Sequence, residues 1–263
     1  MTFTVRYSVT DVLAPISRRR PGRPITPRVA FLVAHDTGNP GATAAAHARW
    51  YRNDPNPPKH VSSAHLFVDD VNIVQTVPAL DRPEQALHVL YNRPTDNTLF
   101  GFDANRAAIG VEYCYGGGID ADEAYARFVW VLAYLCHRHQ LDPSRTITGH
   151  HVLDPGRKTD PVVGLGRSGR SYEQLLRDIV DEFVNCGGGL TAVVAPAAAG
   201  RLITTVHLNE RSGPARRHRS LAKLSPGTPV TCTGTVQGEA VFGNGTWCAT
   251  DRGSYCWSGG LSA

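Results

Sequence analysis

Long apolar runs and paired cysteines are both missing from this chain of 263 residues. No stretch of about 18 consecutive apolar residues occurs, so we expect neither a transmembrane helix nor insertion into a membrane. The first residues lack a cationic segment followed by an apolar one, and we therefore expect no secretory signal peptide. None of the six cysteines forms a CxxC pair, which argues against a zinc knuckle and against a thioredoxin-like redox motif.

The cysteines that are present fall into two groups. Cys114 lies in an apolar segment and Cys136 in a helical one, and we expect both to be buried free thiols. Cys232, Cys248 and Cys256 crowd the end of the chain, where their spacing leaves room for one disulfide without identifying the pair.

Excess positive charge is confined to the end of the chain. Residues from Arg201 onward carry seven Lys and Arg against three Asp and Glu, whereas the first 200 residues carry twenty of each sign. The net charge of +4 therefore resides in the tail. A basic tail favours an anionic polymer as partner, such as nucleic acid, a membrane surface or a cell wall.

A Gly- and Ala-rich segment, residues 187–200, separates two regions with different patterns and is typical of a linker. In residues 1–186, strand and helix patterns alternate, which predicts an α/β domain with a mixed β-sheet flanked by helices. Residues 201–263 contain short strand patterns broken by turn signals, which predict a small all-β domain.

Within the first region, apolar periodicity predicts individual elements. Strands are expected in residues 29–36, 61–78 (two strands around a turn at 69–72), 107–115 and 144–150, and helices in residues 41–53, 120–139 and 171–186. The helix that starts at Asp120 carries Glu123 three residues later, which is the spacing of an N-terminal capping box.

Polar residues at the ends of predicted strands form the candidate site. His35 and His150 each end an apolar strand pattern, and Asp160 lies in the loop beyond the second histidine. Strand ends in α/β sheets gather functional residues, and two imidazoles with one carboxylate are a ligand set of catalytic zinc. Spacing alone leaves open whether these residues bind a metal or are three separate polar side chains.

Two further charged residues fit this chemistry. Lys158 lies two residues before Asp160, where it would either stabilise an oxyanion or be a solvated surface lysine. Glu112 interrupts an otherwise apolar strand, where a carboxylate is costly unless it has a partner or a function. It would act either as a general base or in a structural salt bridge.

Three motifs carry a resemblance to a known family. The segments AHDTG (Ala34–Gly38), NRAAIGVEY (Asn105–Tyr113) and GH followed by PGRKTDP (residues 149–161) occur in this order. Together they resemble the zinc-dependent N-acetylmuramoyl-L-alanine amidases of the peptidoglycan-recognition-like superfamily, over about residues 18–185. The opening segment of this region is also similar to amidase domains of phage endolysins and bacterial autolysins.

The resemblance implies roles for the candidate residues. Zn²⁺ would be held by His35, His150 and Asp160, with Lys158 as oxyanion stabiliser and Glu112 as the base that orients a zinc-activated water. The substrate would be peptidoglycan, cleaved between N-acetylmuramic acid and the L-alanine of the stem peptide. With no expected signal peptide, we expect a monomeric phage endolysin, made in the host cytoplasm and acting on the wall. A bacterial autolysin or effector toxin, and a non-catalytic recognition protein, remain alternatives.

Three other histidines lie near the expected cleft. His88 stands in ALHVLYN (Ala86–Asn92), where the family often has a WHAG-like segment, and we expect it to contact substrate although the Trp and Gly are absent. His65, in the predicted hairpin, would contact substrate or be structural. His151 would be a neighbour of the site.

The tail carries a second resemblance. Residues 208–230 are similar to bacterial SH3-like cell-wall-binding domains, except that Glu210 stands where an apolar residue is usual. The resemblance implies that the tail binds the wall. Trp247, Tyr255 and Trp257 would form either a platform for sugar or peptide, or the core of a small barrel.

One motif has a competing interpretation. RRRPGRP (Arg18–Pro24) looks like a hook for the minor groove of DNA, whereas a flexible basic lead-in is the simpler interpretation. We expect no nucleic-acid partner.

Overall fold

The computed structural model describes residues 3–57, 61–91, 94–188, 200–241 and 244–262. The chain divides into two compact units, Met1–Gly189 and Leu190–Ala263, so the division falls inside the predicted linker. Residues 189–199 of that linker lie outside the described residues.

A six-stranded mixed sheet, in the order β1-β4-β3-β5-β2-β6, organises the first unit. Its strands are β1 (Val9–Asp11), β2 (Phe31–Asp36), β3 (Leu66–Val68), β4 (Ile73–Gln75), β5 (Ala108–Tyr113) and β6 (Ile147–Gly149). Strand β2 runs parallel to both β5 and β6, and β3 runs parallel to β5, whereas the β3–β4 hairpin is antiparallel. The carboxyl ends of β2, β5 and β6 therefore meet at one edge of the sheet.

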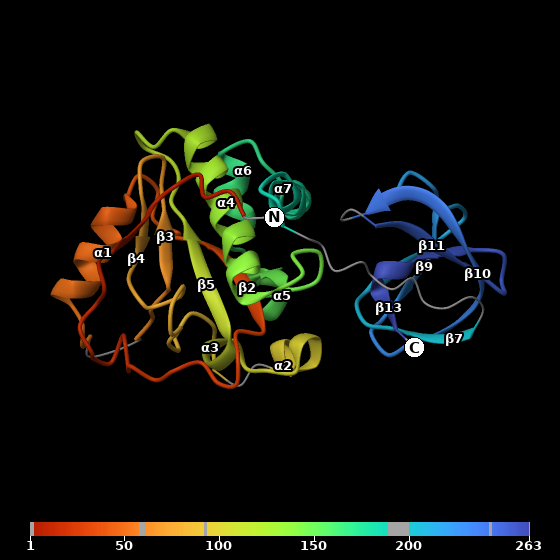
Figure 1. Cartoon of the computed structure of the whole chain (residues 1–263), viewed down its shortest axis with the longest axis horizontal. Coiled ribbons are helices and arrows are strands. Elements are labelled where there is room, and N and C mark those ends of the chain that lie inside the picture. The colour runs from red at the N-terminus through yellow and green to blue at the C-terminus, as the bar shows by residue number, and fades with distance from the viewer. Residues whose placement is uncertain (1–2, 58–60, 92–93, 189–199, 242–243, 263) are drawn as a thin grey trace. The chain divides into compact units, whose positions relative to one another are not determined.

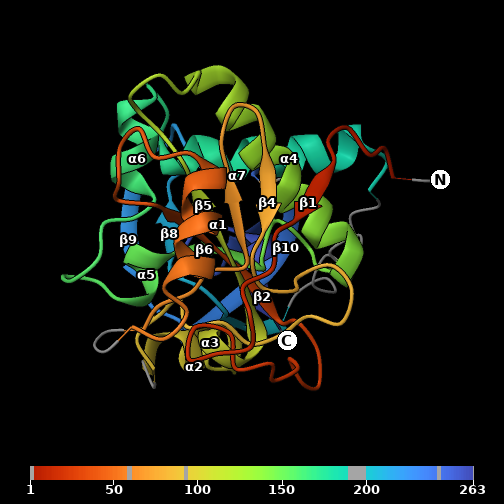
Figure 2. The same cartoon turned by 90° about the vertical axis from the view of Figure 1, so that its left-hand side faces the viewer.

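Helices cover both faces of this sheet (Figure 1), as the alternating pattern predicted. Helix α1 (Ala44–Asn53) packs on β3 and β4 and lies in front of the strands in Figure 2. Helices α4 (Ala121–His139) and α7 (Tyr172–Asn185) pack together on the opposite face. The shorter helices are α2 (Pro94–Phe100), α3 (Ala104–Ala107), α5 (His150–Leu153) and α6 (Val162–Arg167).

The two long helices begin at side-chain caps. The Asp120 carboxylate accepts hydrogen bonds from the backbone N–H groups of Asp122 and Glu123, and the Ser171 hydroxyl caps α7 by accepting from Gln174. These bonds satisfy N–H groups that the first turn of a helix leaves without partners. Neither helix, nor any other in the described part of the chain, is long and apolar enough to cross a membrane.

The strand expected at 144–150 is shorter than predicted. Only Ile147–Gly149 is a strand, because the Asp142 carboxylate accepts from Ser144 and holds the preceding residues in a turn. His150 is the first residue of α5 rather than the last of a strand. It still lies at the sheet edge, since α5 follows β6 directly.

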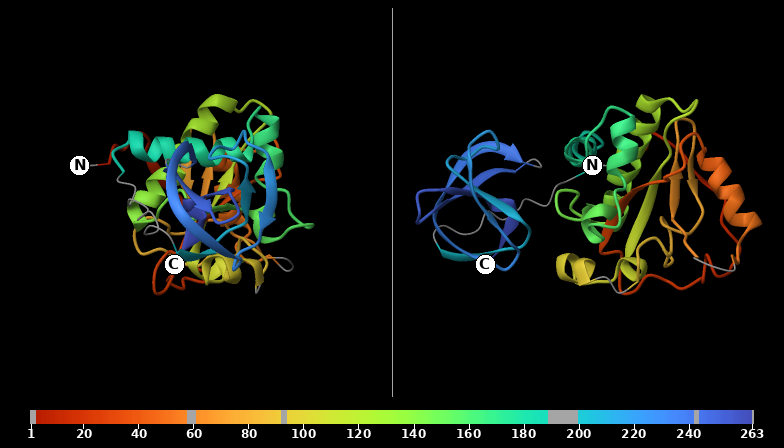
Figure 3. Two further views of the ribbon diagram at one scale, coloured as in Figure 1. Left: turned by 90° about the vertical axis from the view of Figure 1, so that its right-hand side faces the viewer. Right: turned by 180° about the vertical axis from the view of Figure 1, so that it is seen from behind.

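A seven-stranded sheet, in the order β13-β7-β10-β11-β12-β8-β9, forms the second unit, and all its pairs are antiparallel. The strands, strongly curved in Figure 3, are β7 (Gly200–Thr204), β8 (Leu208–Arg211), β9 (Ser220–Leu224), β10 (Pro229–Val241), β11 (Asn244–Thr250), β12 (Tyr255–Trp257) and β13 (Leu261–Ser262). The all-β prediction is confirmed, and the likeness to an SH3-like domain stays a prediction.

The tail aromatic residues, for which the sequence allowed either a binding platform or a barrel core, lie in or against the core of the second unit. Trp247 and Trp257 are buried in it, with their indole N–H groups bonded to backbone carbonyls, so they are core residues and not an exposed platform. Tyr255 is partly buried against the same core. The Glu210 carboxylate is also buried, where it accepts from the Ser254 hydroxyl and pairs with Arg252 at 3.2 Å.

All six cysteines are buried free thiols, as expected for Cys114 and Cys136. The disulfide that the tail spacing left open is not formed. Cys248 and Cys256 lie opposite each other on β11 and β12, within the core of the second sheet.

Candidate metal centre

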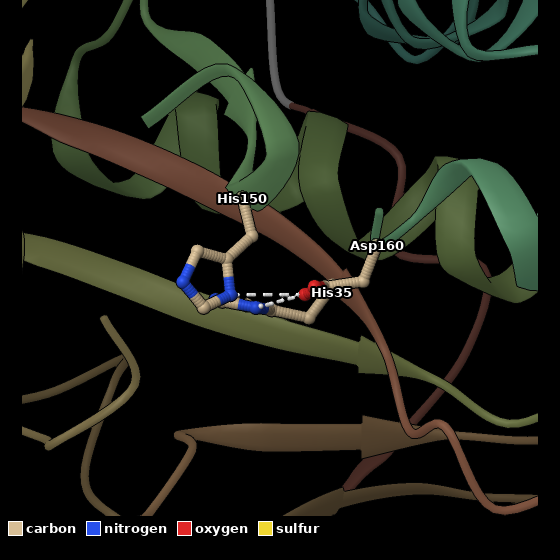
Figure 4. Close-up of side chains that lie close together, drawn as sticks. All are labelled: His35, His150 and Asp160. Atoms are coloured by element: carbon tan, nitrogen blue, oxygen red, sulfur yellow. Dashed lines mark hydrogen bonds and ion pairs between the residues drawn. The ribbon is translucent and has the colours of Figure 1, made fainter. Parts of the chain in front are cut away.

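Three residues far apart in the sequence converge at the carboxyl edge of the first sheet. Ala34 on β2 pairs with Gly149 at the end of β6, so the residues that follow them, His35 on β2 and His150 at the start of α5, lie side by side. Asp160 reaches them from the loop before α6 (Figure 4). One potential ligand atom from each of the three residues lies within 4.8 Å of the other two.

Both imidazoles point at the same carboxylate oxygen. The Nδ1 atoms of His35 and His150 lie 2.8 Å and 3.0 Å from Asp160 Oδ2. Burial alone would raise the pKa of Asp160, but the hydrogen bonds from the two histidines outweigh it and hold that pKa below its usual range. Burial lowers the pKa of His35 to about 4, although the hydrogen bond with Asp160 opposes this.

This arrangement fits a divalent metal ion. Metals bind neutral imidazole and ionised carboxylate, which are the forms that these pKa shifts favour for His35 and Asp160 at neutral pH. Two nitrogens and one oxygen are a donor set that Zn²⁺ accepts, and three protein ligands are the number found in catalytic rather than structural zinc sites.

Glu112 belongs to the same site through strand register. It lies opposite His35 in the parallel β2–β5 pairing, so both side chains point to the same face of the sheet. Its Oε2 is buried without a hydrogen-bond partner among the described residues, which speaks against the structural salt bridge. Burial, and then the charges of Asp160 and Asp36, raise the pKa of Glu112 well above its ordinary value.

A pocket of about 370 Å³ opens onto this cluster. It is lined by His35, Asp36, Thr37, Gly38, Tyr51, Ser62, Ser63, His88, Glu112, His150, Arg157, Lys158, Thr159 and Asp160. The Lys158 ammonium lies 4.0 Å from Asp160 Oδ1 with a third of its side chain exposed, which suits a cation that faces a bound substrate.

A larger pocket of about 440 Å³ lies elsewhere in the first unit, beside α1, β1 and β4. Arg49 and Arg52 line it together with neutral side chains, and none of its lining residues is a histidine or a carboxylate. It therefore lacks the groups that hydrolysis requires, and the smaller pocket is the candidate site.

The three secondary histidines have different surroundings. His88 is buried behind His35, with its Nδ1 3.0 Å from Nε2 of that residue. His65 is fully buried, with one ring nitrogen accepting from the Gly110 N–H and the other bonded to the Glu84 carbonyl, which favours the structural alternative. His151 lies beside the site, its Nδ1 3.3 Å from the Asp160 backbone carbonyl.

In the arginine motif that resembled a DNA hook, Arg19 is buried and Arg20 half-buried, whereas Arg18 and Arg23 are exposed. Arg19 is 1% exposed, its guanidinium lies over the rings of Trp50 and Tyr51, and it donates to the carbonyls of Asp54 and Ser62. In the same motif Arg20 donates to both carboxylate oxygens of Glu84, and Arg18 to the carbonyl of Pro57. Arg19 and Arg20 therefore brace the loops that lead to the pocket wall, and their side chains are not available to a DNA groove.

Asp36 and Tyr51 are among the pocket residues that sequence reasoning missed. Asp36 follows His35, and its carboxylate accepts from the N–H groups of Gly38 and Gly164, which ties α6 to the end of β2. Its place in AHDTG was a signal for it. Tyr51 lies on the buried face of α1, and no sequence signal distinguishes it from a core residue.

Residues 25–162 match the family model described as N-acetylmuramoyl-L-alanine amidase. The chain is 31% identical over 191 residues to N-acetylmuramoyl-L-alanine amidase XlyA of Bacillus subtilis (strain 168), covering 71% of this chain and 54% of that protein. The chain thus spans about half the length of this curated relative.

Two solved structures resemble the first unit. A structure of the catalytic domain of XlyA superposes with a TM-score of 0.51 at 27% identity, covering 66% of this chain and 99% of that one. A mutant endolysin from Bacillus subtilis superposes with a TM-score of 0.52 at 25% identity and the same coverage.

Proposed function

This chain is a member of the N-acetylmuramoyl-L-alanine amidase family, and on that premise we propose that it hydrolyses peptidoglycan. The bond cleaved is the amide between N-acetylmuramic acid and the L-alanine of the stem peptide. One observation carries the proposal: the His35, His150 and Asp160 cluster shares a pocket with the buried carboxyl of Glu112. Buried groups of this kind are costly to a fold unless they serve chemistry.

We infer that the metal is Zn²⁺, held by His35, His150 and Asp160. When bound, it supplies Lewis acidity, which polarises the scissile carbonyl and makes water a stronger nucleophile. The nitrogen-rich donor set supports zinc over magnesium or calcium, which prefer oxygen ligands.

Glu112 would move the proton. Its carboxyl accepts a proton from the attacking water and delivers it to the amine, so the C–N bond breaks and the amine leaves neutral. The raised pKa of Glu112 favours its protonated form, which is the form that delivers the proton to the amine. A divalent cation beside Asp160 would offset one of the negative charges that raise this pKa. Glu112 would then be more readily ionised, which is the form that accepts the proton from water.

Lys158 would stabilise the oxyanion. Its ammonium group lines the pocket on the side of Asp160 and is partly exposed, so a substrate carbonyl can approach it. A fixed cation beside developing negative charge lowers the barrier most in a site that excludes water.

We propose that the second unit binds the wall through the loop between β8 and β9. Arg217 and Arg219 are exposed on this loop, while Arg216 pairs with Glu239 at 2.6 Å. Two exposed guanidinium groups on one loop suit an anionic wall polymer. The fold of this unit is compatible with the SH3-like domain that the sequence predicted.

A phage endolysin that reaches the wall from the host cytoplasm is the biological role we propose, supported by the likeness to a structure titled as an endolysin. A bacterial autolysin or effector toxin would use the same chemistry. A non-catalytic recognition protein would need neither Glu112 nor a complete ligand set, and both are present.

Digestion of purified peptidoglycan tests the activity. The purified protein is incubated with and without a chelator, and new N-terminal alanine is scored against new reducing ends. We expect alanine termini that disappear with the chelator and return with Zn²⁺. Asp160→Ala should abolish them, whereas Asp181→Ala, an exposed carboxylate on α7, should not.

Each other outcome of the digestion contradicts a part of the proposal. Reducing ends without alanine termini would identify a glycosidase and overturn the reaction. Alanine termini that persist in the chelator would overturn metal dependence. Wall binding with no new ends would favour the recognition protein.

A further inference from the structure

His88 has no evident use in the proposed reaction, yet it touches a metal ligand. Its ring lies edge-on to that of His35, at 5.2 Å between centroids and 82° between planes. His88 Nδ1 and His35 Nε2 are 3.0 Å apart, which is hydrogen-bonding distance. His88 is 7% exposed, so this contact is shielded from water.

The backbone beneath His88 is held in place by one side chain. The Asn105 carbonyl oxygen accepts from the N–H groups of His88 and Val89, each at 2.9 Å, and its amide donates to the Val89 carbonyl at 2.7 Å. Asn105 is itself buried. A polar side chain that uses three hydrogen bonds on two neighbouring residues fixes their position closely.

The sheet also leaves space for the His88 ring. Gly110 on β5 faces it, and a Cβ at that position would lie 2.6 Å from His88 Nδ1. Any larger residue at 110 would therefore displace the His88 ring from its present position. The imidazole therefore occupies a place that both Asn105 and Gly110 keep for it.

The hydrogen bond between His88 Nδ1 and His35 Nε2 influences which nitrogen of His35 is free to bind a metal. A neutral imidazole carries one N–H and one free lone pair. Nδ1 of His35 faces Asp160 and His150, so the proton must reside on Nε2 if Nδ1 is to ligate. An acceptor placed 3.0 Å from Nε2 stabilises that tautomer and orients the ring.

We propose that His88 is a positioning residue that holds His35 in its metal-binding orientation and tautomer, by accepting a hydrogen bond from His35 Nε2. The inference rests on the proposed function, because it requires that His35, His150 and Asp160 bind a metal ion. His88 also lines the pocket, so its expected contact with substrate stays a prediction beside this role. Loss of such an outer hydrogen bond typically weakens metal affinity about 10- to 100-fold.

Metal affinity of the full chain tests the proposal without reference to activity. Zn²⁺ is titrated in competition with a chromophoric chelator, and Co²⁺ replaces it to give a visible absorption spectrum of the site. His88→Leu should bind Zn²⁺ about 10- to 100-fold more weakly and shift the Co²⁺ spectrum. His88→Asn places an amide oxygen where Nδ1 was and should recover most of the affinity.

A matched control separates positioning from burial. His47 is also 7% exposed, but its ring stacks on Phe67 and contacts none of the three ligands. His47→Leu should therefore leave the Zn²⁺ affinity unchanged. Thermal unfolding of each metal-free variant shows whether the first unit is folded before its affinity is compared.

Nitrogen NMR of the zinc-loaded wild type covers the case in which His88→Leu does not fold. Isotope-labelled histidine should show the His35 proton on Nε2. A proton on Nδ1, or a folded His88→Leu with wild-type Zn²⁺ affinity, would overturn the positioning role. A wild-type chain that binds no metal would instead overturn the proposed function itself.

Discussion

At the scale of single residues, the site is defined by groups that a stable fold would avoid. Glu112 is half-buried, and its Oε2 is buried and unpartnered among the described residues, in a strand that is otherwise apolar. Its raised pKa is the energetic consequence of removing a carboxylate from water and placing it near Asp160 and Asp36. A group with this cost is the best candidate for the proton transfer.

Glu112→Gln should separate catalysis from metal binding. The amide keeps the shape of the side chain but cannot take a proton, so kcat should fall by about 100-fold or more. Zn²⁺ affinity should stay within a few-fold of wild type, since Glu112 is not among the three clustered ligands. Glu173→Gln, at an exposed position of α7, is the control, and unchanged turnover in Glu112→Gln would remove this residue from the mechanism.

Buried histidines should make the first unit acid-sensitive. Burial lowers the pKa of His47 in the folded chain, while the unfolded value stays near 6.5. The folded state therefore binds fewer protons, and its stability is complete above pH 6.5 and declines as the pH falls below it.

His47→Phe isolates that contribution. The stacking on Phe67 is kept but no proton can be taken up, so the free energy of unfolding should fall less between pH 7.5 and pH 5 than in wild type. Urea unfolding followed by circular dichroism at the helix band reports on the first unit, because the α-helices of the described chain lie there. Parallel pH profiles would show that His47 is not the cause.

At the scale of elements, strand register and strand ends assemble the site. The β2–β5 pairing brings His35 beside Glu112, and the β2–β6 pairing brings it beside His150. The loop between the short helices α5 and α6 then returns the chain so that Asp160 faces both histidines. Sequence patterns predicted these strands, but parallel neighbours that are not consecutive in the sequence emerge only on folding.

The arginine motif is the element that sequence reasoning placed in the wrong surroundings. Basic residues beside Gly and Pro suggest an exposed segment, whereas Arg19 is stacked on Trp50 and Tyr51 and bonded to two backbone carbonyls. Arginine can be buried in this way because its planar guanidinium has five donors and stacks on aromatic rings.

Arg19→Met should destabilise the first unit by about 3 kcal/mol, because buried carbonyls lose their donors and a charge-assisted network is broken. Arg23→Met removes an exposed guanidinium from the same motif and should cost much less. Urea denaturation gives both values. Equal stability of the two variants would mean that the motif does not brace the pocket wall.

At the scale of the whole molecule, the charge that the sequence concentrates in the tail appears on the second unit. Its core is filled by Trp247, Trp257 and the three tail cysteines, so binding must use the surface. Arg217 and Arg219 on the β8–β9 loop are exposed. Wall binding by the second unit, as proposed, would raise the local concentration of the catalytic unit on its substrate.

Removing both loop charges tests that division. Arg217→Gln with Arg219→Gln should weaken sedimentation with intact walls, most strongly at low salt, while cleavage of soluble muropeptides stays unchanged. Arg201→Gln with Lys223→Gln removes the same charge from exposed strand positions and serves as the control. Equal loss in both pairs would mean that net charge, and not the loop, governs wall binding.

The sequence by itself determined the α/β class, the helix cap at Asp120, the all-β second unit and the set of candidate residues. These depend on local periodicity, on side chains within a few positions and on motif spacing, all of which are written along the chain. The resemblance to the amidase family rested on three such motifs, and the family match over residues 25–162 agrees with it.

Tertiary structure decided the rest. It brought Asp160 to both histidines, gave His88 its contact with His35, enclosed His65 and buried Arg19 and the two tail tryptophans. Each of these depends on which strands become neighbours and which loops fold over them. Contacts between residues 50 to 125 positions apart are set by packing of the whole sheet, which local pattern does not encode.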